Sequence, residues 1–214
     1  MIKRVLLGGL LLWLGEAVAA VGAPESGSGP ESELERRLLA MDQVVANFTQ
    51  QVRDAQGYVT ERASGTLQLA KPNFRWEVLA PFPQIIVAKG GQLAIYDPDL
   101  EQVTTKILDE SLTQTPLSLL TQAKLDLSVD FDVSRVDSGE SAAERIFVLR
   151  PRAQDALFQF FEVTFLGDQL QALKIFDHTG QETLIRFTDY QSSQVIQSQV
   201  FELEYPPGTD FVRG

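Results

Sequence analysis

Histidine and cysteine, the side chains that most often carry nucleophilic or metal chemistry, are almost absent from this chain. It contains one histidine, His178, and no cysteine. His178 lies in the polar stretch Asp177 to Gly180, whose composition is typical of a hairpin turn, so we interpret it as a solvated turn residue. A zinc site with the usual ligands would need further histidine or cysteine side chains. We therefore predict no metal site.

The motifs that mark common enzyme sites are missing as well. The stretch Ser138 to Ser141 does not have the spacing of a nucleophile elbow, and there is no phosphate-binding loop, dinucleotide fingerprint or calcium loop. Asp130 and Asp132 share one face of an expected strand and could form an acid pair, but a solvated outer face explains them better. We predict no catalytic residue and no cofactor. An enzyme whose acids meet only in the folded chain stays open as an alternative.

The N-terminus has the pattern of a secretory signal peptide. Met1 to Arg4 is basic, Val5 to Leu14 is an apolar or glycine run, and Ala17 to Ala20 offers small residues for cleavage. The apolar run is too short to cross a bilayer, which needs roughly 20 residues. We expect residues 1–20 to be removed, residues 21–31 to be a flexible mature N-terminus, and residues 32–214 to form a single domain. No cysteine follows the leader, so we expect no lipid anchor there.

The charge of the chain excludes some partners. The chain has 18 basic and 29 acidic residues; removing Lys3, Arg4 and Glu16 with the leader leaves 16 and 28, a net charge of −12. A strongly acidic protein is poorly suited to nucleic acid or to an anionic membrane surface. We therefore expect no nucleic-acid partner.

Hydrophobic periodicity predicts one long helix near the start and a sheet-rich remainder. Ser32 and Glu35 fit a capping box, and the apolar residues after them recur at helical spacing over about four turns. A short second helix is expected over residues 115–122, with Thr115 as N-cap and Pro116 at its first position. The expected strands are 48–53, 57–62, 65–70, 74–79, 84–88, 92–97, 102–107, 128–136, 145–150, 157–166, 170–177, 182–189 and 199–205.

So many strands create a large apolar face with little helix to cover it. A sheet of that size curls or closes, which favours a closed barrel or a half-open one with the helices across the opening. A two-sheet sandwich without a cavity stays open as the alternative.

Several segments, in this order behind a signal peptide, resemble one known family. They are Asn47 to Gln50, Gly65 to Leu67, Lys71 to Glu77, Pro83 to Val87, Tyr96 to Val103, Thr115-Pro116, Phe201 to Leu203 and Pro206 to Gly208. Together they resemble the outer-membrane lipoprotein carrier LolA family. The resemblance implies a mainly β fold: an unclosed antiparallel half-barrel with a helical lid over an apolar cavity.

The resemblance also implies a function and partners. Such carriers work in the Gram-negative periplasm as monomers. They accept acylated lipoprotein cargo from the inner-membrane ABC transporter LolCDE, shield the acyl chains, and deliver the cargo to the outer-membrane receptor LolB. A lipid- or lipoprotein-sensing regulatory module of the same fold is the main alternative. A receptor like LolB is disfavoured by the missing cysteine.

On this resemblance we expect apolar side chains from the sheet and the lid to line the lipid-binding cavity, although ordinary core packing is the alternative for each. They are Phe74, Trp76, Ile86 and Ile95 from the sheet, and Leu34, Leu38, Met41, Val45, Leu117 and Leu120 from the lid. The family often has an arginine before the proline of this segment, where it holds the lid shut. This chain has Lys71 there, so we expect Lys71 to act as a weaker lid latch, with a solvated lysine as the alternative.

Overall fold

A single twisted sheet of 12 strands forms the body of the molecule. The computed structural model describes residues 29–107, 116–122, 125–136, 142–192 and 194–213. The elements in chain order are α1 (Pro30–Leu39), β1 (Gln43–Arg53), β2 (Val59–Ala70), β3 (Asn73–Ala80), β4 (Gln84–Lys89), β5 (Gln92–Asp97), β6 (Gln102–Ile107), α2 (Pro116–Thr121), α3 (Leu127–Asp130), β7 (Phe131–Val136), β8 (Glu144–Pro151), β9 (Phe158–Leu166), β10 (Gln169–Asp177), β11 (Glu182–Gln191), the 3-10 helix η2 (Ser198–Phe201) and β12 (Asp210–Arg213).

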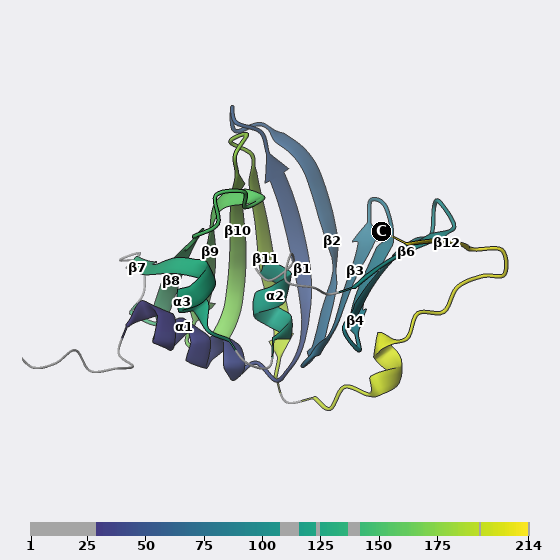
Figure 1. Cartoon of the computed structure of the whole chain (residues 1–214), viewed down its shortest axis with the longest axis horizontal. Helices are drawn as coiled ribbons and strands as arrows, with labels where there is room; N and C mark the ends of the chain where they lie inside the picture. Colours follow the sequence, from purple (N-terminus) through teal and green to yellow (C-terminus); the bar gives the residue numbers. More distant parts are fainter. Residues whose placement is uncertain (1–28, 108–115, 123–124, 137–141, 193, 214) are drawn as a thin grey trace, which may run out of the picture.

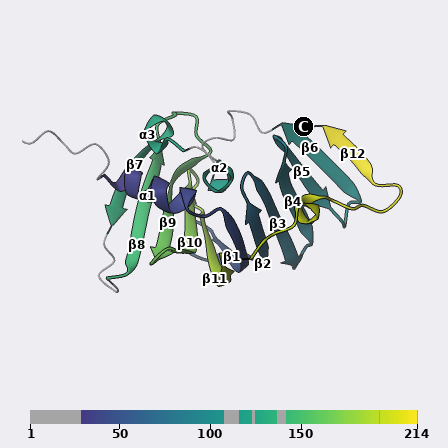
Figure 2. The same cartoon turned by 90° about the horizontal axis from the view of Figure 1, so that it is seen from below.

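The sheet is open, because its first and last strands do not meet. The strand order is β12-β6-β5-β4-β3-β2-β1-β11-β10-β9-β8-β7, and every neighbouring pair is antiparallel except β12 and β6. Figures 1 and 2 show the strands curling into a trough, with α1, α2 and α3 on its concave side. The expected mainly β, unclosed half-barrel with helices across the opening is confirmed.

The alternating residues of the central strands divide the sheet into two unlike faces. On β1, Val44, Ala46 and Phe48 are buried, and they lie opposite Leu69, Leu67 and Gly65 of β2. The same concave face continues onto β3 through Phe74 and Trp76. The main core therefore lies inside the trough, between the sheet and the helices.

A second, smaller apolar contact lies on the convex face. The chain after β11 crosses the outside of β3 and β4, and Phe201 of η2 is only 2% exposed. Arg75 donates a hydrogen bond to the Val200 carbonyl over 3.3 Å, and the rings of Tyr96 and Tyr205 meet edge to face. The segment then ends as β12, parallel to β6. The C-terminal segment thus covers the outside of one half of the sheet.

The first helix differs from its expected form. α1 begins after an extended Gly29 with Pro30 in its first turn, a favourable start because proline lacks the N–H that would be unsatisfied there. It ends at Leu39, and β1 begins at Gln43, so the expected four turns were wrong. Ser32 is not the cap. Glu35 instead accepts a hydrogen bond from the Leu127 backbone N–H over 2.8 Å and joins α1 to α3.

Three strand expectations were also wrong in detail. The two strands expected at 57–62 and 65–70 are a single strand, Val59–Ala70, because Gly65 continues the β2 ladder opposite Phe48. Residues 127–130 form α3, capped by the Asp126 side chain, so β7 begins only at Phe131. Residues 199–205 hold η2 and an extended connection rather than a strand, and the parallel strand β12 was not expected. The signal peptide (1–20), most of the flexible segment (21–28) and the Thr115 cap lie outside the described residues.

Candidate functional site

The concave face of the trough carries the main apolar core, and its two halves differ in how deeply that core is buried. Under α1 and α3, the sheet presents phenylalanines that are fully buried, and Leu34 and Leu38 of α1 pack onto the same cluster. The phenylalanines are Phe131, Phe147, Phe161 and Phe165. Because none of these side chains retains appreciable exposure, this half is ordinary hydrophobic core.

The other half keeps apolar surface accessible. Trp76 and Val78 of β3, Ile86 of β4 and Ile95 of β5 contact the core cluster yet are only half-buried. Leu67 lies opposite Trp76, Trp76 opposite Ile86, and Ile86 opposite Ile95, so their side chains share the concave face. We call Trp76, Val78, Ile86 and Ile95 the apolar wall. Half-buried side chains facing the inside of a trough suit a flexible apolar ligand, because apolar contact is not directional.

Aromatic contacts hold the centre of this wall in place. The Trp76 ring stacks on Phe48, with ring centroids 3.7 Å apart and 21° between the planes, and it meets Phe187 edge to face at 6.3 Å. Phe48 can lie there because Gly65 has no side chain: a Cβ at Gly65 would come within 2.7 Å of the Phe48 ring and 1.9 Å of the Glu77 carbonyl oxygen. The glycine therefore shapes the position of Trp76 through Phe48.

The helix α2 lies over the same half of the sheet. It packs against β3, and its Leu119 and Leu120 are 2% and 4% exposed. Figure 2 shows α2 inside the trough, between its two sides. The backbone of Leu117 belongs to α2, but its side chain lies outside the described residues. α2 thus packs on β3, the strand that carries Trp76 and Val78 of the apolar wall.

Lys71 connects the sheet to the end of α1. It stands between β2 and β3, and its Nζ donates a hydrogen bond to the Leu38 carbonyl in the last turn of α1. A cation is favourable at a helix C-terminus, where carbonyl groups lack helical partners. Burial lowers the pKa of Lys71 below its ordinary value, and the Asp42 carboxylate offsets part of that effect.

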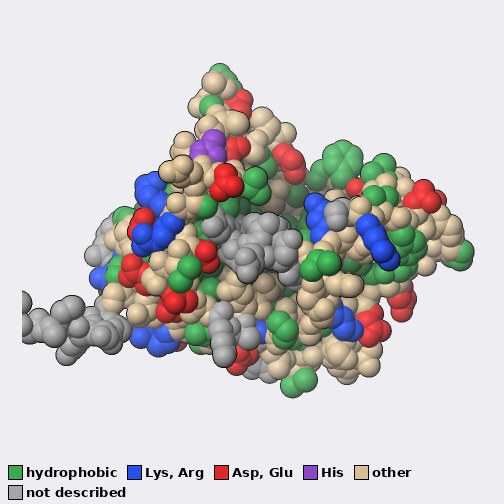
Figure 3. Space-filling view, viewed as in Figure 1, with side chains coloured by type: hydrophobic (Ala, Val, Ile, Leu, Met, Phe, Trp, Pro, Cys, Tyr) green, Lys and Arg blue, Asp and Glu red, His purple; other side chains and the backbone are tan. Residues whose placement is uncertain are grey.

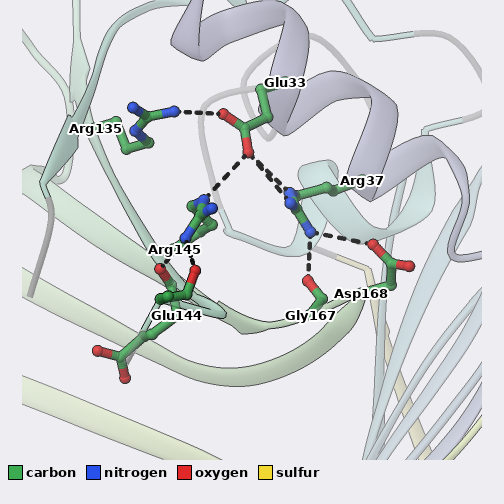
Figure 4. A network of polar contacts seen from close by, with 8 residues as sticks. Glu33, Arg37, Arg135, Glu144, Arg145, Gly167 and Asp168 are labelled. Atoms are coloured by element: carbon green, nitrogen blue, oxygen red, sulfur yellow. Dashed lines mark hydrogen bonds and ion pairs between the residues drawn. The ribbon is translucent and has the colours of Figure 1, made fainter. Parts of the chain in front are cut away.

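The opposite part of α1 is held by a cluster of charges, shown in Figure 4. Glu33 binds Arg37 of its own helix at 3.2 Å and Arg135 of β7 at 3.0 Å, with Arg145 of β8 at 3.9 Å. Burial opposes the ionisation of Glu33, but the hydrogen bonds from Arg135 and Arg37 outweigh it, so the pKa of Glu33 is lowered. Arg37 also donates to the Gly167 carbonyl, which fixes α1 to the turn between β9 and β10.

The expected lining residues fall into distinct environments. Leu34, Leu38, Met41, Phe74 and Leu120 are all under 5% exposed and already fill the core. Trp76, Ile86 and Ile95 are half-buried on the concave face and form most of the apolar wall.

Val45 is not a lid residue. It lies on β1 between two core side chains and therefore points to the other face, because the strand begins earlier than helical spacing suggested. Val78, Phe48 and Phe187 were missing from the expected lining. The alternation Phe74, Trp76, Val78 was the signal that could have included Val78, whereas the other two depend on strand pairing.

Two side chains weighed as candidates for metal or acid chemistry, His178 and Asp132, are exposed. Among the described residues, no group of three histidine, cysteine or acidic side chains could hold a metal ion. His178 is exposed in the turn after β10, where Nε2 lies 2.9 Å from the Ala156 carbonyl oxygen, and Asp132 is exposed and bound to Arg152 at 2.6 Å. None of the helices in the described ranges is both long and apolar enough to span a bilayer.

Comparison with known proteins identifies the family. The family model described as outer membrane lipoprotein carrier protein LolA matches residues 40–204. Proteins named outer-membrane lipoprotein carrier protein are similar over nearly the whole chain. The one from Chromohalobacter salexigens is 34% identical and covers 94% of this chain and 95% of its own. The one from Hahella chejuensis is 36% identical and covers 92% and 94%.

Solved structures agree on the fold. An uncharacterized conserved protein from Thermus thermophilus superposes with a TM-score of 0.53 at 16% identity, over 85% of this chain and 98% of that one. At that identity the likeness shows the fold alone. From the family match and the close relatives, the chain belongs to the outer membrane lipoprotein carrier LolA family.

Proposed function

We propose that this protein is a lipoprotein carrier that shields the acyl chains of its cargo against the apolar wall. The observation that supports this most strongly is the wall itself: Trp76, Val78, Ile86 and Ile95 stay half-buried inside the trough, whereas the phenylalanines under α1 and α3 are fully buried. The relatives that share a third of its sequence are named for the same task. A carrier needs such accessible apolar surface, which a closed core does not provide.

The energetics of acyl chains explain why a carrier is needed. Each methylene removed from water contributes about 0.8 kcal/mol, so several acyl chains amount to tens of kcal/mol. Cargo of this kind crosses an aqueous compartment only when a protein covers its acyl chains. We propose that the compartment is the Gram-negative periplasm, reached after removal of residues 1–20, and that the protein works there as a monomer. The described residues add no membrane-spanning helix.

The partners follow from the same proposal. Cargo would come from the inner-membrane transporter LolCDE and pass to the outer-membrane receptor LolB. Release requires that the helices move away from the sheet, and the contact from Lys71 to the Leu38 carbonyl lies where such movement would break it. We assign Lys71 the role of a latch on α1. On that role, Lys71→Leu alters the transfer of cargo to the receptor, whereas transfer at the wild-type rate would contradict it.

A release assay tests the proposed function. Purified mature protein is added to spheroplasts, and the supernatant is searched for lipoprotein that co-elutes one-to-one with it on a sizing column. Ile95→Gln, which makes the wall polar, should lower the yield of complex. Ile107→Gln is the matched control, because Ile107 is 72% exposed near the end of β6 and is not part of the wall.

The outcomes separate the alternatives. Soluble complexes that Ile95→Gln weakens and Ile107→Gln does not would support a carrier that uses the wall. Complexes unaffected by either change would keep the carrier and remove the wall from its site. Absence of released lipoprotein, with folded protein and an active transporter, would favour a lipid-sensing module of the same fold.

A further inference from the structure

One edge in the middle of the sheet is left without a partner strand. β2 pairs with β1 from Val59 to Ala70, but its pairing with β3 begins only at Ser64, opposite Ala80. β3 ends there because Pro81 and Pro83 follow; proline has no N–H to add to a ladder. The β1–β2 hairpin therefore rises beyond the end of β3, as Figure 1 shows. Residues 59–63 of β2 face a gap that we call the β2 notch.

The backbone of the notch has unused hydrogen-bonding capacity. Alternate residues of a strand direct their N–H and C=O groups to the same side, so part of the 59–63 backbone points towards the missing neighbour. In the described part of the chain, no loop or turn residue donates to or accepts from the backbone of residues 60–63. Unpaired strand edges are templates for strand addition by another chain.

A pocket of about 490 Å³ lies at the notch, and the charged residues that line it are both arginines. It is lined by Thr49, Gln50, Gln51, Arg62, Ala63, Ser64, Ala80, Pro81, Leu184 and Arg186. Arg62 lies opposite Gln51, and Arg186 lies opposite Thr49, so both arginines are on the convex face of strands that flank β1. Both are exposed, and neither forms an ion pair with any residue that the structure describes.

Apolar side chains stand at the rim of the notch. Leu79, near the end of β3, is 57% exposed, and Phe82, in the turn from β3 to β4, is 74% exposed; they flank the pocket residues Ala80 and Pro81. Figure 3 shows apolar side chains gathered at this corner of the molecule. Large exposed apolar residues beside a concave polar surface are typical of an interaction site.

We propose that the β2 notch is a docking site for an extended acidic segment of a partner protein, which adds as a strand to residues 59–63. Its backbone would pair with β2, its carboxylates would lie near Arg62 and Arg186, and an apolar side chain would rest on Phe82. A second copy of this chain is disfavoured, because its own notch would bring Arg62 against Arg62. An anionic membrane is disfavoured, because Glu61 stands beside Arg62 and the whole chain carries a net charge of −11.

The proposed docking site is independent of cargo binding. The pocket arginines lie on the convex face, whereas the apolar wall lies on the concave face. Docking is therefore testable without lipid, and its failure would leave the carrier proposal intact.

The test uses isotope-labelled mature protein and a defined peptide probe. The probe has eight residues and alternates valine with aspartate or glutamate; a second peptide replaces each acid with lysine, and a third carries N-methyl groups on alternate amides. The acidic peptide should shift the amide signals of residues 59–63. The lysine peptide should not bind, because the arginines repel it, and the N-methylated peptide should not bind, because it cannot form the ladder.

Charge reversal provides the matched variants. Arg62→Glu with Arg186→Glu should weaken the acidic peptide at least about tenfold, because two charge-assisted contacts are lost. Arg213→Glu changes an exposed arginine on β12 and should leave the affinity unchanged. All three substitutions are at exposed positions, so unfolding is not expected.

Four results would overturn the proposal. The acidic peptide could fail to bind at millimolar concentration, or bind with unchanged affinity to the double variant. It could also shift amides of the apolar wall instead of residues 59–63. Finally, phosphatidylglycerol vesicles could bind through Arg62 and Arg186 while the peptide does not, which would assign the notch to a membrane surface.

Discussion

Removing the Lys71 side-chain amine tests how firmly α1 is held to the sheet. The Leu38 carbonyl accepts a hydrogen bond from Lys71 and a second one from the Met41 backbone N–H over 3.2 Å. In Lys71→Leu the carbonyl keeps the bond from Met41, so no buried acceptor is left unsatisfied. A hydrogen bond from a charged group contributes about 1.5–3 kcal/mol, and the burial that lowers the pKa of Lys71 offsets part of it.

The expected net loss is about 1 kcal/mol, equivalent to a fivefold rise in the population with the end of α1 detached. Hydrogen exchange measures it directly: amides in the last turn of α1 should exchange about five times faster in Lys71→Leu. Lys71→Arg, which keeps a cationic donor, should exchange close to the wild-type rate. Equal protection in Lys71→Leu and wild type would refute the latch, as would faster exchange spread evenly over the whole sheet.

Three further predictions follow from single contacts. Gly65→Ala should lower the free energy of unfolding by about 1–3 kcal/mol in urea titrations, because the new Cβ would lie 1.9 Å from the Glu77 carbonyl oxygen. Ser64→Ala changes an exposed neighbouring residue and should have little effect. Equal losses of stability in the two variants would argue against the clash. Glu33→Gln should lower stability by about 1–2 kcal/mol at neutral pH, because it removes the charge that binds Arg37 and Arg135. Because the pKa of Glu33 is lowered in the folded state, its contribution to stability is fully present above pH 4.5, the ordinary pKa of a glutamate, and is lost as the pH falls through the folded-state pKa. The difference in stability between wild type and Glu33→Gln should therefore shrink in acid. A difference that stays constant with pH would contradict the assignment. The pKa of Lys71 is also lowered in the folded state, so its effect on stability has the same sign: wild type should gain stability relative to Lys71→Leu as the pH rises towards 10.5, and a flat profile would count against its burial.

The strands were predictable because one-sided burial leaves a period of two in the sequence. Phe74, Trp76 and Val78 show it plainly, and the structure places all three on the concave face. The extent of α1 was less predictable, because Leu34, Leu38, Met41 and Val45 fit helical spacing even though Val45 belongs to a strand. Here the pairing of β1 with β2 outweighs local periodicity.

The candidate site shows the same limit. Hydrophobicity identifies side chains that leave water, but it does not separate Phe74, at 4% exposure, from the half-buried Ile86 on the neighbouring strand. That distinction depends on what α1 and α2 cover, which is a property of the folded chain. The Glu33 cluster was equally hidden, because Arg135 and Arg145 lie about a hundred residues away in sequence.

Quenching of Trp76 by cargo tests the central claim most directly. Trp76 is the only tryptophan outside residues 1–20, so emission from the mature chain reports on the apolar wall alone. A triacylated lipopeptide with brominated chains, compared with the same lipopeptide without bromine, quenches only tryptophan in direct contact with the chains. We predict strong quenching by the brominated form in a one-to-one complex and none by the other. A stable complex in which the brominated chains leave Trp76 emission unchanged would contradict the assignment of the wall.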